Sequence, residues 1–323
     1  MSSQSREQRL RGVRGAARKQ FSLKGFILND SSVKSSHPNS VWITGAGGLI
    51  GNYLVQLAPQ FAPQFEAVGL TRSQLDLLDF AAVRAAFRSQ NPAAIIHCAA
   101  MSKSQDCQAN PALARKINVE TTALLADLAA EIPFLFFSTD LVFNGRQGNY
   151  VETDAVAPLS SYAETKVAAE QIVLANPRHT VIRTSLNGGT SPTGDRGFNE
   201  QMRRAWQAGQ TLNLFCDEYR SPIPAAATAR ATWELLARKQ TGLFHVAGAE
   251  RLSRAEIGTA LAARWPQLNP KLRVGSLQDY QGVPRSPDTS LNSAKAQAQL
   301  SFPLPGLTAW LRENPAEVFC SQP

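Results

Sequence analysis

The sequence predicts an α/β protein: a Rossmann-type doubly wound parallel sheet with a smaller C-terminal substrate-binding subdomain. Short β-branched or aromatic runs alternate with helix-period segments from residue 40 onward. Strands separated by helices of ten or more residues require right-handed crossovers, which build a parallel sheet covered on both faces. A glycine-rich turn follows the first run, and the alternation loosens after residue 185. We therefore expect a basic, disordered extension over 1–39, a dinucleotide-binding domain over 40–185 and a mainly substrate-binding subdomain over 186–323.

The predicted elements follow from hydrophobic period and from helix caps. Strands are expected in the first domain at 41–44, 65–71, 93–100, 133–139 and 179–185. Helices are expected between them at 49–61, 79–90, 111–131 (one long helix) and 160–175. Beyond residue 185 we expect helices at 198–210, 226–240 and 253–265, a strand at 242–248, a turn-rich segment at 217–225 and a Pro-rich loop at 283–292. A serine cap opens the helix at 253.

Composition limits the class of protein. The chain has 323 residues, 43% of them hydrophobic, which suffices for a substantial core. No window approaches 18 consecutive apolar residues, so we expect no membrane span. The four cysteines, Cys98, Cys107, Cys216 and Cys320, form no CxxC pair, which argues against a zinc site and against a disulfide framework. We therefore predict no metal and a reducing compartment, the cytoplasm.

The net charge of +8 is concentrated at the N-terminus. Residues 1–38 hold 8 basic and 2 acidic side chains, which leaves 25 basic and 23 acidic residues for the rest of the chain. The Ser- and Arg-rich leader resembles an organelle transit peptide or a solvated tail, and an organelle stroma is the alternative location if it is a transit peptide. No aromatic residue interleaves the basic cluster at 6–19, so we expect no nucleic-acid partner.

The turn after the first predicted strand points to a dinucleotide. It contains Gly45, Gly48 and Gly51 at a spacing of three, followed by a helix. In such a turn the first glycine allows the reversal, the second lets the backbone approach a pyrophosphate, and the third lets the helix lie close to the sheet. A glycine triplet alone is a weak signal, but a strand before it and a helix after it favour dinucleotide binding.

The end of the second predicted strand indicates which dinucleotide binds. A cofactor with a free ribose 2′-hydroxyl usually meets a carboxylate about 20 residues after the turn. This chain has Thr71, Arg72 and Ser73 there, and a guanidinium can pair with a 2′-phosphate, so NADP(H) is favoured and NAD(H) remains open. Arg72 could equally lie in solvent. Asp76 could accept from the adenine amino group. Alternatively, either Asp76 or Asp79 could cap the next helix.

Tyr162 and Lys166 stand four residues apart in a predicted helix, which places both side chains on one face. A phenol has a reference pKa of about 10, and we expect the neighbouring ammonium to lower it. The pair could then protonate a carbonyl oxygen as hydride arrives. By chance such a pair can also lie idle on an exposed helix. Ser138 and Thr139 end the fourth predicted strand, at the edge where open α/β sheets bind ligands.

Four ordered motifs, "TGAGGLIG", "HCAA", "FFSTDLVFNG" and "YAETK", resemble the extended short-chain dehydrogenase/reductase family. Within it, "STDLVFNG", "DEYRSPI", "GLFHVAG" and "RSPDTSLN" resemble the dTDP-4-dehydrorhamnose reductase (sugar-nucleotide-binding) branch. That branch also includes the regulatory beta subunit of methionine adenosyltransferase. The resemblance runs from about Ser40 to Leu311 and does not cover the leader.

The resemblance implies a role for each matching residue. Tyr162 would be the proton donor, Lys166 its partner, and Thr139 the hydroxyl that holds the substrate carbonyl. The implied cofactor contacts are Gly45, Gly48, Leu49 and Ile50 at the pyrophosphate, Asp76 and Leu77 at adenine, and Cys98, Ala99 and Ala100 along the cofactor. From their places in the chain we also expect Gly51, Arg72 and Ser138 to contact the cofactor. The implied substrate contacts are Asp140, Arg220 and Arg285, of which the two arginines would face the diphosphate of a nucleotide sugar, although either could form an ordinary surface ion pair.

Three positions depart from the branch pattern. Leu141 and Asn144 replace a Tyr and an Asp of "STDYVFDG", and Leu186 replaces a Trp near the sugar, which weakens the case for rhamnose in particular. We expect an NADPH-dependent reductase of a 4-keto nucleotide sugar. The alternatives are a non-catalytic NADP-binding regulatory subunit of a partner enzyme, and another nucleotide-sugar-modifying dehydrogenase such as a dehydratase or epimerase. A homodimer stays open, with the helix at 111–131 as a candidate face.

Overall fold

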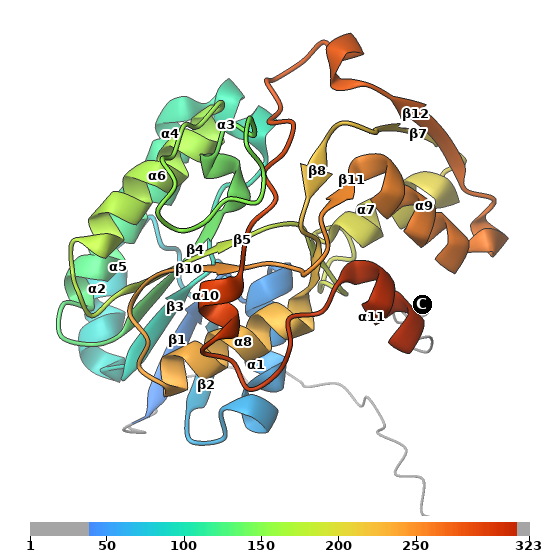
Figure 1. Ribbon diagram of the computed structural model, residues 1–323. Coiled ribbons are helices and arrows are strands. Elements are labelled where there is room, and N and C mark those ends of the chain that lie inside the picture. Colours follow the sequence, from blue (N-terminus) through green and yellow to red (C-terminus); the bar gives the residue numbers. More distant parts are fainter. Residues whose placement is uncertain (1–38, 315–323) are drawn as a thin grey trace, which may run out of the picture. The chain divides into compact units, whose positions relative to one another are not determined.

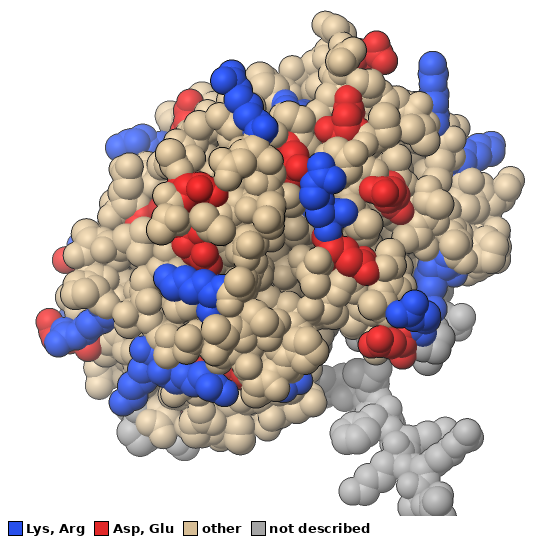
Figure 2. All heavy atoms as spheres, in the orientation of Figure 1, with Lys and Arg blue, Asp and Glu red and all other residues tan. Residues whose placement is uncertain are grey.

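The computed structural model describes residues 39–314. The predicted extension over 1–39 lies outside these residues except for Asn39, and so does Cys320. Within residues 39–314, no helix is long and apolar enough to cross a membrane. Figure 2 shows basic and acidic side chains interspersed over the visible face, as expected from the nearly balanced charge after residue 38.

A six-stranded parallel sheet forms the centre of the fold, in the order β10-β5-β4-β3-β1-β2. Its strands are β1 (Ser40–Thr44), β2 (Glu66–Leu70), β3 (Ala94–His97), β4 (Phe134–Thr139), β5 (Thr180–Thr184) and β10 (Gly242–Val246). Thr44 is in register with Leu70 on one side and with His97 on the other, so these strand ends are level. The chain order reverses beside β1, which is where doubly wound sheets bind their ligands. The predicted fold class is confirmed.

Helices cover both faces of this sheet (Figure 1). α1 (Leu49–Phe61) and α8 (Ala225–Ala237) lie on one face, where Val41 and Ile43 of β1 join their core. α2 (Phe80–Gln90), α5 (Thr121–Leu128) and α6 (Ser161–Leu174) lie on the other, where Trp42 joins a second core. Successive strand residues point to opposite faces, so the continuous apolar run of β1 supplies both cores.

The single long helix predicted over 111–131 is wrong in detail. The segment forms α4 (Pro111–Arg115), a π-helical turn η1 (Lys116–Glu120) and α5, which ends at Leu128. Buried Asn118 lies in the widened turn, where its side chain bonds the backbone of Met101 in both directions, at 2.8 and 3.0 Å. The wide turn directs this side chain toward another segment, a feature that helical periodicity does not encode.

Two elements that follow residue 186, the strand β10 and the helix α8, belong to the sheet and to its helical cover. β10 pairs in parallel with β5, from Gly242 opposite Thr180 to Val246 opposite Thr184. α8 packs against α1, and Trp233 Nε1 donates to Leu54 O at 3.0 Å. The sheet and its helical cover therefore include residues well beyond the predicted boundary at 185, because β10 pairs with the edge of β5.

A smaller lobe with its own apolar core is drawn beside the sheet in Figure 1. Its helices are α7 (Phe198–Gln207), α9 (Arg254–Arg264) and α11 (Leu307–Glu313). Its strands form three pairs: β6 (Asn187–Gly188) with β9 (Ile223–Pro224), β7 (Thr211–Phe215) with β12 (Lys271–Gly275), and β8 (Tyr219–Arg220) with β11 (Leu252–Ser253). The predicted serine cap is confirmed: Ser253 and Glu256 form a capping box at the start of α9.

Candidate active site

The turn between β1 and α1 is compressed against the end of β3. Gly45 has a φ of +70°, and a Cβ at this position would lie 2.7 Å from Ala99 N. A Cβ on Gly51 would lie 2.4 Å from Gly45 O, so the third glycine allows the helix to approach the turn. Gly48 caps α1 without a side-chain hydrogen bond, and the first turn has no acidic residue. The N-terminal amides of α1 are thus left available to an anion.

A hydrogen bond between β1 and β3 fixes the position of this turn. Thr44 Oγ1 lies 2.6 Å from His97 Nδ1 and accepts from Cys98 N at 3.2 Å. Burial lowers the pKa of His97 to about 3, with a smaller contribution from Lys166. His97 is therefore neutral, and it holds the two strand ends together without adding charge.

A cavity of about 730 Å³ lies over these strand ends. Most of the predicted cofactor and catalytic residues line it together, as the sequence predicts: Gly45, Gly48, Leu49, Ile50, Gly51, Arg72, Cys98, Ala99, Ala100, Ser138, Thr139, Tyr162 and Lys166. Gly47 of the glycine turn lines it as well, and so do residues outside the quoted motifs: Ser102, Asn187, Arg196, Phe198, Gln201 and Arg254. Most of these come from loops and helices of the smaller lobe, whose side chains no local pattern could place.

The adenosine end differs in part from the expected arrangement. Asp76 and Leu77 do not line the cavity, whereas Thr71 and Arg72 do. The Arg72 side chain is 81% exposed and lies 3.9 Å from Asp76, a weak ion pair. Of the two candidate caps for α2, it is Asp79 that accepts from Ala82 N, at 2.9 Å. Asp76 instead accepts from Leu78 N in the preceding loop.

Helix α6 carries Tyr162 and Lys166 into the cavity. Ser160 caps the helix by accepting from Ala163 N. The side chains of Tyr162 and Lys166 are both buried. Lys166 Nζ lies 3.9 Å from the centre of the Phe136 ring. Burial lowers the pKa of Lys166 to about 7, although the Glu170 carboxylate and Cys98 act in the opposite direction.

The expected lowering of the Tyr162 pKa is wrong. Burial raises the pKa of this phenol, the Asp140 carboxylate raises it further, and a hydrogen bond with Thr139 offsets only part of the effect. Removing the phenolate from water costs more free energy than the hydrogen bond with Thr139 returns. Tyr162 is thus a protonated acid, ready to donate. Burial also raises the pKa of Cys98, which remains a thiol.

Asp140 is held by other groups of the protein. Its buried carboxylate accepts from Ser185 Oγ at 2.7 Å, Thr289 Oγ1 at 3.0 Å and Thr139 Oγ1 at 3.1 Å, and it lies 3.8 Å from Arg220 Nε. It does not line the cavity over the strand ends, nor the neighbouring cavity that contains Arg220 and Arg285. Asp140 joins the end of β4 to the Pro-rich loop, and protein groups already occupy the carboxylate that we expected to meet substrate.

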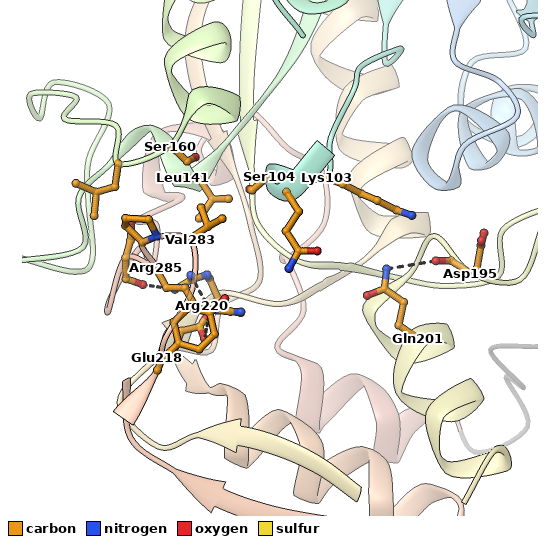
Figure 3. Close-up of a pocket in the computed structure, with 15 residues that line it drawn as sticks. Lys103, Ser104, Leu141, Ser160, Asp195, Gln201, Glu218, Arg220, Val283 and Arg285 are labelled. Atoms are coloured by element: carbon orange, nitrogen blue, oxygen red, sulfur yellow. Dashed lines mark hydrogen bonds and ion pairs between the residues drawn. The ribbon is translucent and has the colours of Figure 1, made fainter. Parts of the chain in front are cut away.

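A second cavity, of about 560 Å³, contains the two predicted diphosphate arginines (Figure 3). Glu218 is 2% exposed and accepts from Arg220 Nη2 at 2.9 Å and from Arg285 Nε at 3.0 Å. Figure 3 shows this cluster on one side of the hollow and Gln201 with Asp195 on the other. Gln201 lines both cavities, so they adjoin. The two predicted arginines are brought together, but around a shared carboxylate.

Asn118 is a buried polar residue near this site that sequence reasoning missed. Its amide donates to Thr165 Oγ1 at 3.0 Å, and Thr165 donates to Tyr162 O at 2.7 Å. Asn118 therefore positions the helix that carries the predicted proton donor. A signal was available: an asparagine in the middle of a predicted helix is unfavourable unless its side chain finds a specific partner.

Comparison with known proteins agrees with this architecture. The family model described as "RmlD substrate binding domain" matches residues 39–318. The dTDP-4-dehydrorhamnose reductase of Mycobacterium tuberculosis (strain H37Rv) is 32% identical over 266 residues, covering 78% of this chain and 84% of that protein. The methionine adenosyltransferase 2 subunit beta of Xenopus laevis is 28% identical over 269 residues, covering 79% and 80%.

A solved structure shares the fold. The dTDP-4-dehydrorhamnose reductase of Bacillus anthracis, crystallised in complex with NADP, superposes with a TM-score of 0.75 at 23% identity, covering 83% of this chain and 95% of that one. The resemblance of the sequence motifs to the dTDP-4-dehydrorhamnose reductase branch is confirmed by these matches.

Proposed function

Since this chain belongs to the RmlD substrate binding domain family, we propose that it is an NADPH-dependent reductase of a 4-keto nucleotide sugar, similar to dTDP-4-dehydrorhamnose reductase. One observation carries the proposal: Tyr162, Lys166 and Thr139 line the same cavity as the glycine turn. A proton donor and a dinucleotide cradle that share one cavity are what a carbonyl reductase needs.

The residues present fit a dinucleotide. Side chains at Gly45 and Gly51 would collide with backbone atoms, and the start of α1 has neither a side-chain cap nor an acidic residue, so the turn suits a pyrophosphate. Thr71 and the exposed Arg72 at the end of β2 favour a 2′-phosphate, which supports NADPH over NADH. The similar reductase structure from Bacillus anthracis holds NADP.

The chain's own residues supply the proton and the orientation. When bound, NADPH supplies the hydride. Tyr162 donates its phenolic proton to the carbonyl oxygen, and its raised pKa keeps that proton in place until the oxygen becomes basic. Thr139 Oγ1 hydrogen-bonds with Tyr162 and so orients the phenol; to hold the same oxygen, its hydroxyl would turn its one proton from Asp140 to the substrate. Lys166, buried beside them, stabilises the phenolate that proton transfer leaves.

The regulatory-subunit alternative is supported by the similarity to methionine adenosyltransferase 2 subunit beta, such as that of Xenopus laevis. Against it, the buried Tyr162, Lys166 and Thr139 remain together in a cavity. A dehydratase is disfavoured because Asp140 is followed by Leu141 and its carboxylate is held by protein groups. Leu186 lines the cavity where the reductase branch tends to have Trp, so the sugar of the proposed substrate need not be rhamnose.

The test is NADPH oxidation, followed at 340 nm, with dTDP-4-keto-6-deoxyhexoses and with their UDP counterparts. We expect turnover by the wild type, and a loss of about 10²-fold or more in kcat for Tyr162→Phe, as for removal of a general acid. Tyr150→Phe is the control, because it removes a phenol that lies outside both cavities. Tight NADPH binding without turnover of any nucleotide sugar, together with a stoichiometric protein partner, would favour the regulatory subunit.

The cellular compartment and the oligomeric state of the protein can also be tested. The protein would work in a reducing compartment, the cytoplasm or an organelle stroma, and would bind no nucleic acid. Cys98, Cys107 and Cys216 are free thiols, which fits such a compartment. Fluorescent tagging of the whole chain, with and without residues 1–38, tests the location. Sedimentation at several protein concentrations tests for a homodimer.

A further inference from the structure

Within the described part of the chain, the guanidinium of Arg254 has no hydrogen-bond or ion-pair partner. Arg254 is the first residue of α9, and its backbone N donates to Glu218 O at 2.8 Å. Its Nη1 atom is buried and has no hydrogen-bond partner within residues 39–314. No ion pair or hydrogen bond from its guanidinium is present in that part of the chain. Arg254 is half-buried, and a buried guanidinium nitrogen left without a partner costs free energy, so its position needs an explanation.

The charges around it do not balance. Arg220 and Arg285 both bind Glu218, which uses both oxygens of that carboxylate. Asp140 accepts from three hydroxyls and lies near Arg220. Three buried or half-buried arginines therefore face two carboxylates, and neither carboxylate bonds Arg254.

Arg254 keeps its charge in this position. Burial lowers its pKa, Arg220 and Arg285 add to this lowering, and Glu218 and Asp140 oppose it; the resulting pKa is about 10. A group with that pKa is still protonated at neutral pH. The cluster thus holds one positive charge that the protein does not neutralise.

The location of Arg254 indicates what would neutralise it. Arg254 lines the cavity that contains Tyr162, Thr139 and Lys166. Its backbone is bonded to Glu218, which lines the adjoining cavity, and Gln201 lines both. Arg254 therefore stands where the reacting end of the site meets the cluster of Arg220 and Arg285. A ligand that extends from the first cavity into the second must pass this side chain.

We infer that Arg254 binds the diphosphate of the nucleotide sugar, and that it is the anion contact in this site in place of Arg220 and Arg285, which Glu218 already holds. The inference rests on the proposed function for the identity of the sugar but not for the anion. A guanidinium binds phosphate oxygens through its planar pair of N–H donors, and the site offers this fork without a competing carboxylate. Arg220 and Arg285 instead shape the wall of the second cavity.

The experiment compares Arg254→Met and Arg254→Lys with the full-length wild type. Arg273→Ala is the matched control, since it removes an exposed arginine from the same lobe that lines neither cavity. Calorimetric titration measures binding of dTDP, of thymidine, of inorganic pyrophosphate and of NADPH. We expect Arg254→Met to weaken dTDP binding tenfold or more and Arg254→Lys to weaken it less, while thymidine and NADPH binding stay unchanged. In the reductase assay the KM for the nucleotide sugar should rise more than kcat falls.

Thermal unfolding separates a binding role from a structural one. Without ligand, Arg254→Met should melt at the same temperature as the wild type or higher, because an unpartnered buried charge has been removed. It should also lose the rise in melting temperature that dTDP gives the wild type. A lower melting temperature without ligand would show that Arg254 supports the fold instead, and would overturn the inference.

Other outcomes also decide. Unchanged dTDP affinity in Arg254→Met, or no binding of dTDP and pyrophosphate by the wild type, would overturn the inference. A parallel loss of NADPH affinity would overturn it too, because the anion would then belong to the cofactor. If no nucleotide sugar is turned over but dTDP binding depends on Arg254, the proposed reductase function fails and this inference stands. If nucleotide sugar is turned over and the KM does not change in Arg254→Met, the reductase function stands and this inference fails.

Discussion

Asn118 Nδ2 donates a hydrogen bond of 3.0 Å to Thr165 Oγ1, which ties the π-helical turn η1 to the helix that carries Tyr162 and Lys166. The same amide pairs with both backbone groups of Met101, in the loop that follows β3 and its cavity-lining residues. One buried side chain thus couples the cofactor side of the cavity to the proposed proton donor.

Asn118→Leu should destabilise the protein by about 1–3 kcal/mol, because it leaves the part-buried N–H of Met101 without its partner and leaves the C=O of Met101 with only the weak Cys107 thiol donor. Urea unfolding measures the change. Asn176→Leu is the control: it also removes an amide bond to a backbone carbonyl, that of Ala130, but in an exposed position. Equal losses of unfolding free energy in the two variants would contradict the role given to Asn118.

The glycine turn gives a matched pair of variants. Gly51→Ala should destabilise the fold by about 1–3 kcal/mol, because its Cβ would lie 2.4 Å from Gly45 O. Gly47→Ala should leave the unfolding free energy nearly unchanged, because the nearest atom to its Cβ would be Thr71 Cγ2 at 3.8 Å. Thermal unfolding without cofactor compares them. A tolerated Gly51→Ala would mean that the helix does not approach the turn so closely.

Stability should depend on pH through Lys166. Its pKa is lowered from 10.5 to about 7, so between these values the unfolded chain holds a proton that the folded chain releases. The contribution of Lys166 to stability therefore rises with pH across this window, and burial of its charge costs most below pH 7. The stability advantage of Lys166→Met over the wild type should shrink from pH 7 towards 10. A difference that is constant across urea titrations at these pH values would refute the lowered pKa.

Glu170 should control both the stability of α6 and the charge on Lys166. Its carboxylate bonds Arg183 Nε at 2.9 Å and Nη2 at 2.7 Å, with both side chains buried, and it raises the pKa of Lys166. Glu170→Gln should cost about 3 kcal/mol, since it leaves Arg183 without its counter-charge. It should also move the pH dependence attributed to Lys166 to lower pH. Glu164→Gln, an exposed change on the same helix, should do neither.

Arg72 should select the cofactor. Arg72→Ala is expected to weaken NADPH binding by ten- to a hundredfold, the loss of a charged hydrogen bond of about 1.5–3 kcal/mol, and to leave NADH binding unchanged. Arg88→Ala, in the last turn of α2, is the control. Fluorescence titration of both dinucleotides measures the ratio. If the two affinities fall together, Arg72 does not read the 2′-phosphate.

Local patterns in the sequence were sufficient for much of the fold and site. Local patterns predicted the five strands up to residue 185, helices α1, α2 and α6, the cap at Ser253, the glycine turn and the Tyr162–Lys166 face, because each depends on residues within a few positions of one another. Helix α3 (Ser104–Ala109) and the division of 111–131 were not predicted. Contacts across longer separations were not predicted either. β10 pairs with a strand some sixty positions earlier, and the π-helical turn exists because Asn118 bonds Met101 and Thr165.

The sequence by itself determined which reactive groups the protein carries and in what order. Only the tertiary structure decided their charge states and their availability. Tyr162 and Lys166 have pKa values set mainly by burial, which depends on the whole fold. Arg220 and Arg285 match a family motif but are held by Glu218, whereas Arg254 matches none and its guanidinium has no partner among residues 39–314. The free energy of a charged group depends on the solvent and countercharges around it, and distant parts of the chain provide both.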